Sequence, residues 1–260
     1  MPKPLREDAT LDAFLRLTDA CGIEGAVCFA PFPYQMDAPN AWLAAEIRGR
    51  AGLVGYGTLD PAQPPGDQVA AIADLGFRGV KLHPSAQRFA LDGTWARAAY
   101  AALMEHRLIA DFHTGIHWHR VADCDPRLYD DIAFSHPELR LVFEHVGGWH
   151  FFKPMVALIS NYSPRLFAGI ASALDREHQR YWHLGAAGLE DCRWQTGADH
   201  MIYGLDFPYN GVAAVQRDLA VINAMGWPQE DVAKLLGGNL KRLLGERKAR
   251  NAECGVRNAE

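Results

Sequence analysis

Four short apolar stretches of this chain end in residues that can bind a metal ion or transfer a proton. They are GVKLHP with Lys81 and His83, DFHTG with His113, FEHVGG with Glu144 and His145, and YGLDFP with Asp206. Imidazoles and carboxylates that meet in a buried site serve as metal ligands or as acid–base groups, because an unpaired buried carboxylate is costly. The spacing therefore predicts a metal or catalytic site made from strand ends.

These endings belong to a set of seven predicted strands. The strands are expected at Gly25–Ala30, Gly52–Leu59, Phe77–His83, Leu108–His113, Leu139–His145, Leu166–Ala171 and Met201–Asp206. They are short, apolar throughout and bounded by Gly or Pro, which is typical of a parallel sheet covered by helices on its outside. In a β/α barrel the C-terminal ends of such strands converge on one mouth, which brings distant residues together.

Predicted helices alternate with these strands. They are expected at Thr10–Ala20, Asp67–Leu75, Asp92–Arg107, Pro126–Phe134, from Pro154 onward, and at Gly211–Met225, Pro228–Leu236 and Leu240–Leu244. The alternation predicts a single domain over residues 1–245 that is either a doubly wound sheet or a (β/α)₈ barrel. Residues 246–260 have few apolar side chains and repeat Arg-Asn-Ala-Glu, so we expect a disordered tail. Asn239 is expected to be a structural cap beneath the barrel.

Composition excludes several classes of function. The 260 residues are 49% hydrophobic and 22% charged with a net charge of −5, which predicts a globular chain without the basic surface that nucleic acid requires. Five cysteines without a C-x-x-C spacing and the lack of a secretory h-region predict a reduced cytoplasmic protein. No apolar run approaches the roughly 20 residues of a membrane span. We therefore expect a small-molecule substrate and neither a nucleic-acid nor a membrane partner.

The motifs also resemble a known family. GFRGVKLHP, HTG, EHVGG, YGLDFP and LLGGNLKRLLG occur in this order between Thr10 and Leu244. In this order they resemble the amidohydrolase-related family of metal-dependent hydrolases and decarboxylases, in the branch of aminocarboxymuconate-semialdehyde decarboxylase. The resemblance implies a distorted (β/α)₈ TIM barrel with a divalent metal at the strand ends. We expect Zn²⁺, with Mn²⁺ as the alternative.

The resemblance also implies roles for individual residues. It makes His113 and Asp206 metal ligands, with Asp206 as the proton acceptor, and it places His145 against the substrate or the activated water. Lys81 ends a strand that carries a carboxylated lysine in some binuclear relatives, and we do not assume that modification here. Because side chains alternate along a strand, Lys81 and His83 share one face and are expected to line the substrate site.

Alternation also separates Glu144 from His145. Neighbouring residues of a strand point to opposite faces, so only one of these two is expected to face the barrel mouth.

One departure from the family pattern concerns the first strand. The family begins with an H-x-H pair that supplies two ligands, and no such pair precedes Thr10 in this sequence. The one H-x-H is His117-Trp118-His119, which follows the strand of His113 and is not in the family position. We therefore expect a barrel without its first strand, with a gap and two exposed strand edges. A translation start set too far downstream, a truncation with lost activity and a rebuilt site remain alternative explanations.

Three functions are compatible with these residues. The first is a metal-dependent hydrolase of a small carboxylic acid, lactone or amide, in which Asp206 takes the proton of metal-activated water and His145 polarises the carbonyl or stabilises the oxyanion. The second is a non-oxidative decarboxylase that uses the same site. The third is a catalytically silent barrel that binds a small molecule or a partner, because two ligands alone hold zinc poorly. A homodimer that covers the exposed edge is a further expectation.

Overall fold

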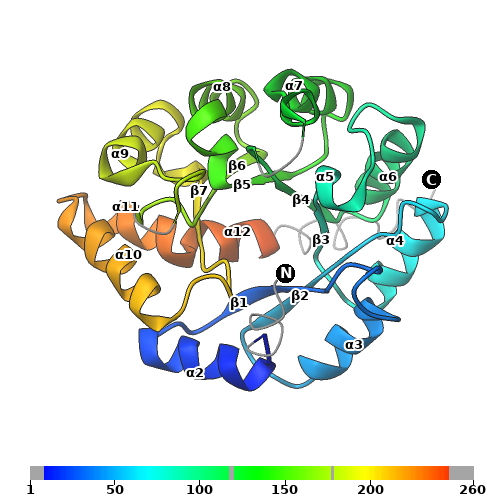
Figure 1. Ribbon diagram of the computed structural model, residues 1–260, viewed down its shortest axis with the longest axis horizontal. Helices are drawn as coiled ribbons and strands as arrows, with labels where there is room; N and C mark the ends of the chain where they lie inside the picture. The colour runs from blue at the N-terminus through cyan, green and yellow to red at the C-terminus, as the bar shows by residue number, and fades with distance from the viewer. Residues whose placement is uncertain (1–8, 117–119, 177–178, 246–260) are drawn as a thin grey trace, which may run out of the picture.

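The fold is one parallel sheet that curls into an open barrel with helices on its outside (Figure 1). The computed structural model describes residues 9–116, 120–176 and 179–245. The strands are β1 (Ala26–Phe29), β2 (Leu53–Gly57), β3 (Gly79–Leu82), β4 (Ile109–His113), β5 (Leu141–Glu144), β6 (Leu166–Ala171) and β7 (Met201–Gly204). Each strand pairs in parallel with the next one along the chain. The predicted TIM-barrel fold with one strand missing is confirmed.

Helices alternate with the strands; most cover the outer face of the sheet, and the last one lies under the end of the barrel (Figure 1). They are α2 (Leu11–Cys21), α3 (Pro39–Glu46), α4 (Pro65–Asp74), α5 (Pro84–Gln87), α6 (Thr94–Glu105), α7 (Pro126–Ser135), α8 (Gly148–Asn161), α9 (Gly185–Thr196), α10 (Val212–Ala224), α11 (Gln229–Ala233) and α12 (Asn239–Gly245). None of the helices within the described ranges combines the length and the apolar character that crossing a bilayer would require. The predicted tail at 246–260 lies outside the described residues, and the single-domain boundary stays a prediction.

The barrel is open between its first and last strands. Within the described ranges β1 and β7 each pair with one neighbour and not with each other. Next to this opening α2 packs against α10, and the ring of Phe14 lies 5.5 Å from that of Phe207. Phe29 on β1 is 40% exposed, as expected for a side chain at an uncovered sheet edge.

Two apolar layers hold the sheet. The outer layer lies between the sheet and the helices and includes Val80, Leu82 and Phe112. The inner layer fills the lower part of the barrel and consists of Tyr56, Ile109, Val142, Phe167, Ile202 and Leu243. Asn239 closes this end, since its Nδ2 donates hydrogen bonds to the carbonyl oxygens of Ala198 at 2.6 Å and Met201 at 2.8 Å. The predicted structural role of Asn239 is thus confirmed.

Two helix starts show how the sequence sets the elements. The side chain of Asp125 accepts from the backbone N–H of Arg127 at 2.9 Å ahead of Pro126, which starts α7 as expected. The prediction that a helix begins at Pro154 is wrong, because α8 begins at Gly148 and contains Pro154 in its interior. Gly147 and Gly148 have positive φ angles of 77° and 61°, and they turn the chain from the end of β5 directly into the helix.

Candidate active site

Two histidines stack at the C-terminal ends of adjacent strands. His83 follows β3 and His113 ends β4, and their ring centroids lie 3.9 Å apart with an angle of 9° between the planes. The parallel register pairs Lys81 with Asp111, so the residues two positions further on also face each other. Lys81 and His83 therefore lie on the inner side of the barrel, as the sequence predicts for a shared face. Their role in substrate binding stays a prediction.

His145 leaves the strand and turns toward these rings. It follows β5 with a φ of 64°, and its ring centroid lies 4.9 Å from that of His113. Its Nδ1 donates a hydrogen bond to the carbonyl oxygen of Ala171 at 2.8 Å, because a carbonyl can only accept. Burial lowers the pKa of His145 from its usual value, with the Asp206 carboxylate acting in the opposite direction. The imidazole is therefore neutral at pH 7, with its lone pair on Nε2.

Glu144 and His145 both reach the site, which corrects the expectation that only one of them could. Glu144 is the last residue of β5 and keeps the inward direction of that strand. The left-handed backbone at His145 and Val146 ends the alternation, so the imidazole is not turned to the outer face. Thr114 stabilises this turn: its hydroxyl donates to the carbonyl oxygen of Glu144 at 2.6 Å and accepts from the N–H of Gly147 at 2.7 Å.

Trp182 covers the histidines. Its ring stacks on His145 at 4.6 Å with an interplanar angle of 20°, and it meets His113 edge to face at 5.1 Å. The indole needs two glycines: a Cβ at Gly115 would lie 2.8 Å from its Cζ3 atom, and one at Gly148 would lie 3.0 Å from its Cε3 atom. The glycines of the HTG and HVGG motifs thus leave the space in which Trp182 packs.

Asp206 lies at the end of β7 and is held by a serine. Its φ is 50°, and its Oδ2 accepts the hydroxyl proton of Ser172 at 2.5 Å. Ser172 directly follows β6 and also has a left-handed backbone, with a φ of 54°. His145 after β5, Ser172 after β6 and Asp206 after β7 therefore all have a left-handed backbone without being glycine. This conformation costs free energy, and it is found most often at functional sites.

A row of buried charged groups lies directly below the histidines. Nζ of Lys81 lies 2.6 Å from Oδ1 of Asp111, and it also lies 4.6 Å from the ring centroid of Phe29. The carboxyl groups of Asp111 and Glu144 are hydrogen-bonded to each other, which requires a proton between them. Burial and the neighbouring Asp111 carboxylate raise the pKa of Glu144 to about 8. Burial also raises the pKa of Asp111, although the Lys81 ammonium opposes this shift.

Aromatic side chains form the outer wall of the mouth. The ring of Phe32 lies 6.0 Å from that of His83 and stacks on Tyr34 at 5.7 Å. Tyr209 lies close enough to Asp206 and Tyr34 for both to act on the pKa of its hydroxyl, which burial raises. Tyr34 is 65% exposed and Tyr209 is 48% exposed. These rings offer a planar, apolar surface beside the histidines and the carboxylate.

The described residues offer an incomplete set of ligands for the divalent metal that the family resemblance implies. Stable zinc sites use three or four protein ligands. Within residues 9–116, 120–176 and 179–245 no three His, Cys, Asp or Glu side chains lie close enough together to hold a metal ion. His113 and Asp206 are the two predicted ligands in this part of the chain, and His117 and His119 lie outside it. The described residues alone therefore do not make a metal centre.

Sequence reasoning missed the aromatic wall of Phe32, Tyr34 and Tyr209, and it missed Ser172, Asp111 and Trp182 among the buried residues of this site. Ser172 follows a correctly predicted strand, so the strand-end rule that selected His113 and Asp206 could have found it. Asp111 lies two positions before His113 on the same face, and alternation could have revealed it. Trp182 lies in the segment between β6 and α9, where neither a strand end nor a motif marks it.

The parallel strand order defines a TIM-barrel fold, and the cluster of titratable side chains lies at the C-terminal ends of its strands. The family described as Amidohydrolase matches residues 3–245, and the chain belongs to this family. Solved structures described as a decarboxylase and as a hydrolase share its fold, and the chain is an amidohydrolase-type enzyme. A comparison with curated protein sequences gives no match.

Solved structures with the same fold come from several bacteria. An uncharacterized TIM-barrel protein from Bordetella bronchiseptica is 22% identical, with a TM-score of 0.76 over 94% of this chain and 85% of that one. A Pseudomonas putida protein described as a 2-pyrone-4,6-dicarboxylic acid hydrolase is 21% identical, with a TM-score of 0.69 over 91% and 88%. A dihydroxybenzoic acid decarboxylase from Polaromonas is 14% identical, with a TM-score of 0.69 over 97% and 93%. That decarboxylase contains manganese, and a Burkholderia multivorans amidohydrolase contains zinc, so two proteins with this fold each hold a divalent metal.

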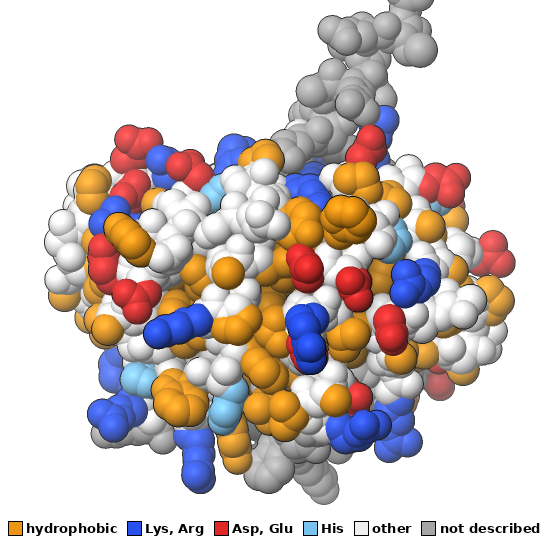
Figure 2. Space-filling model, turned by 90° about the horizontal axis from the view of Figure 1, so that it is seen from above, with side chains coloured by type: hydrophobic (Ala, Val, Ile, Leu, Met, Phe, Trp, Pro, Cys, Tyr) orange, Lys and Arg blue, Asp and Glu red, His pale blue; other side chains and the backbone are white. Residues whose placement is uncertain are grey.

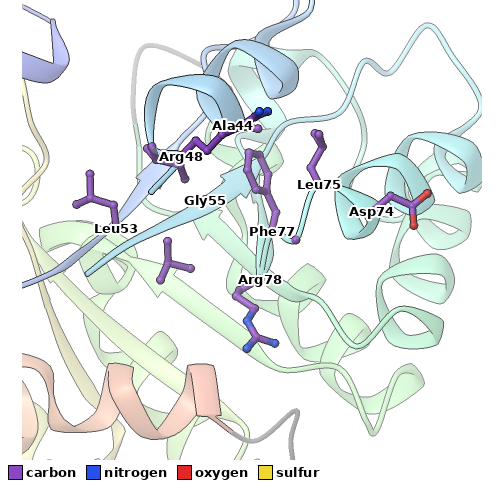
Figure 3. Close-up of a pocket in the computed structure, with 11 residues that line it drawn as sticks. Ala44, Arg48, Leu53, Gly55, Asp74, Leu75, Phe77 and Arg78 are labelled. Atoms are coloured by element: carbon purple, nitrogen blue, oxygen red, sulfur yellow. The ribbon is translucent and has the colours of Figure 1, made fainter. Parts of the chain in front are cut away.

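A separate pocket lies at the other end of the strands. It has a volume of about 430 Å³ and lies between α3, α4 and the first half of β2. Figure 3 shows Arg48 and Arg78 on opposite sides of Phe77, so the two guanidinium groups do not converge on one point. The pocket is remote from His113 and Asp206, and we assign it no part in the chemistry.

Proposed function

We propose that this enzyme hydrolyses a small carboxylic acid derivative, a lactone or an amide, at the mouth of the barrel. The observation that carries the proposal is the placement of His145 and Asp206 at the same end of the barrel. Each lies at the end of a different strand and is fixed by its own hydrogen bond, and the Asp206 carboxylate acts on the pKa of the imidazole. Two fixed proton acceptors at one mouth are what general-base hydrolysis requires.

The tautomer of His145 determines what it can do. Its Nδ1 hydrogen is donated to Ala171, and its lowered pKa leaves Nε2 without a proton. A neutral Nε2 accepts a hydrogen bond and does not donate one, so the expected role in polarising a carbonyl or stabilising an oxyanion does not suit this state. We assign His145 the role of orienting the attacking water, whose other proton passes to Asp206 as the oxygen attacks the carbonyl carbon. Asp206 then returns this proton to the leaving oxygen or nitrogen as the acyl C–O or C–N bond breaks, which releases the carboxylic acid and regenerates the carboxylate.

The aromatic wall narrows the substrate class. Phe32, Tyr34 and Tyr209 surround the mouth, and Trp182 closes it on the side of His145. Aromatic rings bind planar apolar groups through offset stacking and burial of apolar area. The best substrates are therefore expected to carry a ring next to the bond that is hydrolysed. A ring lactone or an aryl amide meets this condition.

A divalent metal is part of the proposal as a cofactor, with Zn²⁺ expected and Mn²⁺ as the alternative. When bound, such an ion lowers the pKa of water toward neutrality. In this chain His113 and Asp206 would hold it, and the remaining ligands would have to come from outside the described residues. The roles of His145, Asp206 and the aromatic wall follow from the side chains alone.

A decarboxylase on the same site is the second candidate. It is favoured by the several solved neighbours described as decarboxylases of hydroxybenzoic acids, which share this fold. An aromatic acid would stack on the same wall, and Asp206 would handle the proton at the carbon that loses CO₂. The third candidate, a silent barrel that binds without turnover, is favoured by the incomplete ligand set among the described residues.

A product assay separates the three candidates. The purified chain, with and without added Zn²⁺ or Mn²⁺, is incubated with aryl lactones, aryl amides, aliphatic lactones and hydroxybenzoic acids. We expect acid release from a ring-bearing lactone or amide and no CO₂. Release of CO₂ from the acids would replace the proposal by the decarboxylase. Binding of the panel, measured by calorimetry, without any product would favour the silent barrel.

A further inference from the structure

Asp206 ends a chain of hydrogen bonds that runs to the segment of Trp182. Nε2 of Gln179 donates to Oδ1 of Asn210 at 2.9 Å, and Nδ2 of Asn210 donates to Oγ of Ser172 at 2.9 Å. Ser172 in turn donates to Oδ2 of Asp206 at 2.5 Å. Ser172 is 2% exposed and Asn210 is 5% exposed, so these bonds are shielded from water.

The direction of each bond is fixed by chemistry. An amide Nδ2 can only donate, so Ser172 accepts from Asn210 and its single hydrogen remains for Asp206. Asn210 is itself locked, because its Nδ2 also donates to the carbonyl oxygen of Leu205 at 3.0 Å. A hydroxyl that donates to a carboxylate forms a charge-assisted bond, which is shorter and stronger than a neutral one. One carboxylate oxygen is thereby fixed, while Oδ1 accepts no hydrogen bond from any described residue.

We propose that Ser172 is a positioning residue that, oriented by Asn210, holds Oδ2 of Asp206 so that Oδ1 faces the reacting water. This inference rests on the proposed function for its catalytic meaning. The backbone of Ser172 supports it, since a left-handed φ of 54° is costly for serine and turns the hydroxyl toward the next strand end. The same chain ties Asp206 to the segment that carries Trp182, because Gln179 also accepts the backbone N–H of Trp182 at 3.0 Å.

Ser172 as a nucleophile is the rival interpretation. A serine on a strained turn beside a carboxylate has the residue types of an activated nucleophile. However, Ser172 is buried, its hydrogen is donated to Asp206, and one of the two lone pairs of its oxygen accepts from Asn210, so the hydroxyl is held inside the hydrogen-bond chain and shielded from the solvent. A fluorophosphonate probe decides between the two roles, because it modifies nucleophilic serines covalently. Modification of Ser172 would overturn the positioning role.

Matched variants test the hydroxyl itself. Ser172→Thr keeps the hydroxyl. Ser172→Val has the same β-branched shape as the threonine variant but carries a methyl group in place of the hydroxyl, so both variants strain the backbone equally. We expect Ser172→Ala and Ser172→Val to lower kcat by about tenfold to hundredfold with KM changed less than twofold, since misplacement of a catalytic group costs about that much. Ser172→Thr should recover most of kcat. Equal kcat values for the Thr and Val variants would contradict the proposal.

A second readout does not depend on turnover. Protein labelled with ¹³Cγ-aspartate gives a resonance for Asp206 that is assigned by its loss in Asp206→Asn. We expect Ser172→Ala to shift this resonance and Ser163→Ala to leave it unchanged. Ser163 is the matched control, because its hydroxyl is hydrogen-bonded to His200 at 2.8 Å just before β6, remote from the site. An unshifted resonance in Ser172→Ala overturns the inference, whereas absence of turnover with a shifted resonance removes only the proposed function.

Discussion

At the scale of single residues, Lys81, Asp111 and Glu144 form a row of buried charged groups below the histidines. Glu144 extends over Gly169, where a Cβ would lie 2.6 Å from its Oε2, so this glycine provides the space for the carboxyl group. There it shares a proton with Asp111, and Asp111 also accepts from Lys81. With that proton, one ammonium faces one net negative charge, and the buried row is neutral. Buried charges are tolerated when they are balanced and hydrogen-bonded in this way.

The shared proton predicts how stability depends on pH. The pKa of Glu144 is raised from 4.5 to about 8 in the folded chain, so its contribution is fully present below 4.5 and is lost as the pH rises through 8. Glu144→Gln stays neutral and still donates to Asp111. We expect the free energy of unfolding of the wild type, from urea titrations in EDTA, to fall relative to this variant by up to about 1.4 kcal/mol per pH unit over this range. Parallel curves would show that Glu144 is ionised, and the exposed Glu138→Gln serves as a control that follows the wild type.

Single residues also show where sequence reasoning reaches its limit. His83, His113 and Asp206 could be placed at the mouth because strand ends converge in this fold. His145 could be named but not oriented, because alternation along a strand does not foresee the left-handed turn that follows β5. The role of Ser172 depends on a partner 34 positions away along the chain, and no local pattern encodes such a contact.

At the scale of elements, the motif glycines and Trp182 form one unit. Gly115 has a φ of 87°, and a Cβ there would lie 2.8 Å from both the Gly147 carbonyl oxygen and Trp182. The loop after β4 and the turn after β5 can therefore meet the indole only if this position has no side chain. The segment between β6 and α9 is thereby held over the histidines by the loop after β4 and the turn after β5.

Gly115→Ala tests this unit. We expect it to lower the free energy of unfolding by about 1–3 kcal/mol, since it combines backbone strain with a steric clash. Turnover should fall at least about tenfold, because Trp182 is displaced from His145. The control is Gly66→Ala in α4, where nothing lies within 4 Å of the new Cβ and φ is not positive. Urea titrations followed by tryptophan fluorescence compare the two, and equal stability of both variants would contradict the account of the glycine.

Most elements were predictable because their signals are local. All seven strands appear at the expected places, since short apolar runs between glycines and prolines have few alternatives. Helices α3 and α9 were not predicted, because neither has the clear apolar stripe that marks an amphipathic helix in a sequence. The start of α8 was misplaced because Pro154 has the pattern of a first-turn proline, while the actual start depends on the glycine turn after β5.

At the scale of the whole molecule, the opening between β1 and β7 is the main departure from a closed barrel. The expectation of a barrel with one strand missing came from the absence of the H-x-H pair, and the pairing of the described strands confirms it. How the opening is covered could not be predicted from the sequence. A homodimer stays a prediction.

Figure 2 shows hydrophobic side chains exposed among charged ones on the face over α7 and α8, where Phe134 is 77% exposed and Trp149 is 68% exposed.

Metal binding is also a property of the whole molecule, because its ligands come from distant strands. We expect added Zn²⁺ or Mn²⁺ to bind to the wild-type chain at least about tenfold more tightly than to His113→Ala or Asp206→Ala, since these residues supply the predicted ligands. Isothermal titration calorimetry gives the dissociation constants, and elemental mass spectrometry gives the metal retained after gel filtration. Equal affinity in the wild type and both variants would place the metal elsewhere in the molecule.

The most direct measurement of the central claim follows oxygen from water into product. The chain is incubated with the best ring-bearing lactone or amide in H₂¹⁸O, beside Asp206→Asn and His145→Gln variants whose folding is checked by circular dichroism. We expect ¹⁸O in the product carboxylate of the wild type, and a turnover at least about a hundredfold lower in both variants. Turnover that persists in Asp206→Asn, or a product that contains no ¹⁸O, would contradict the central claim.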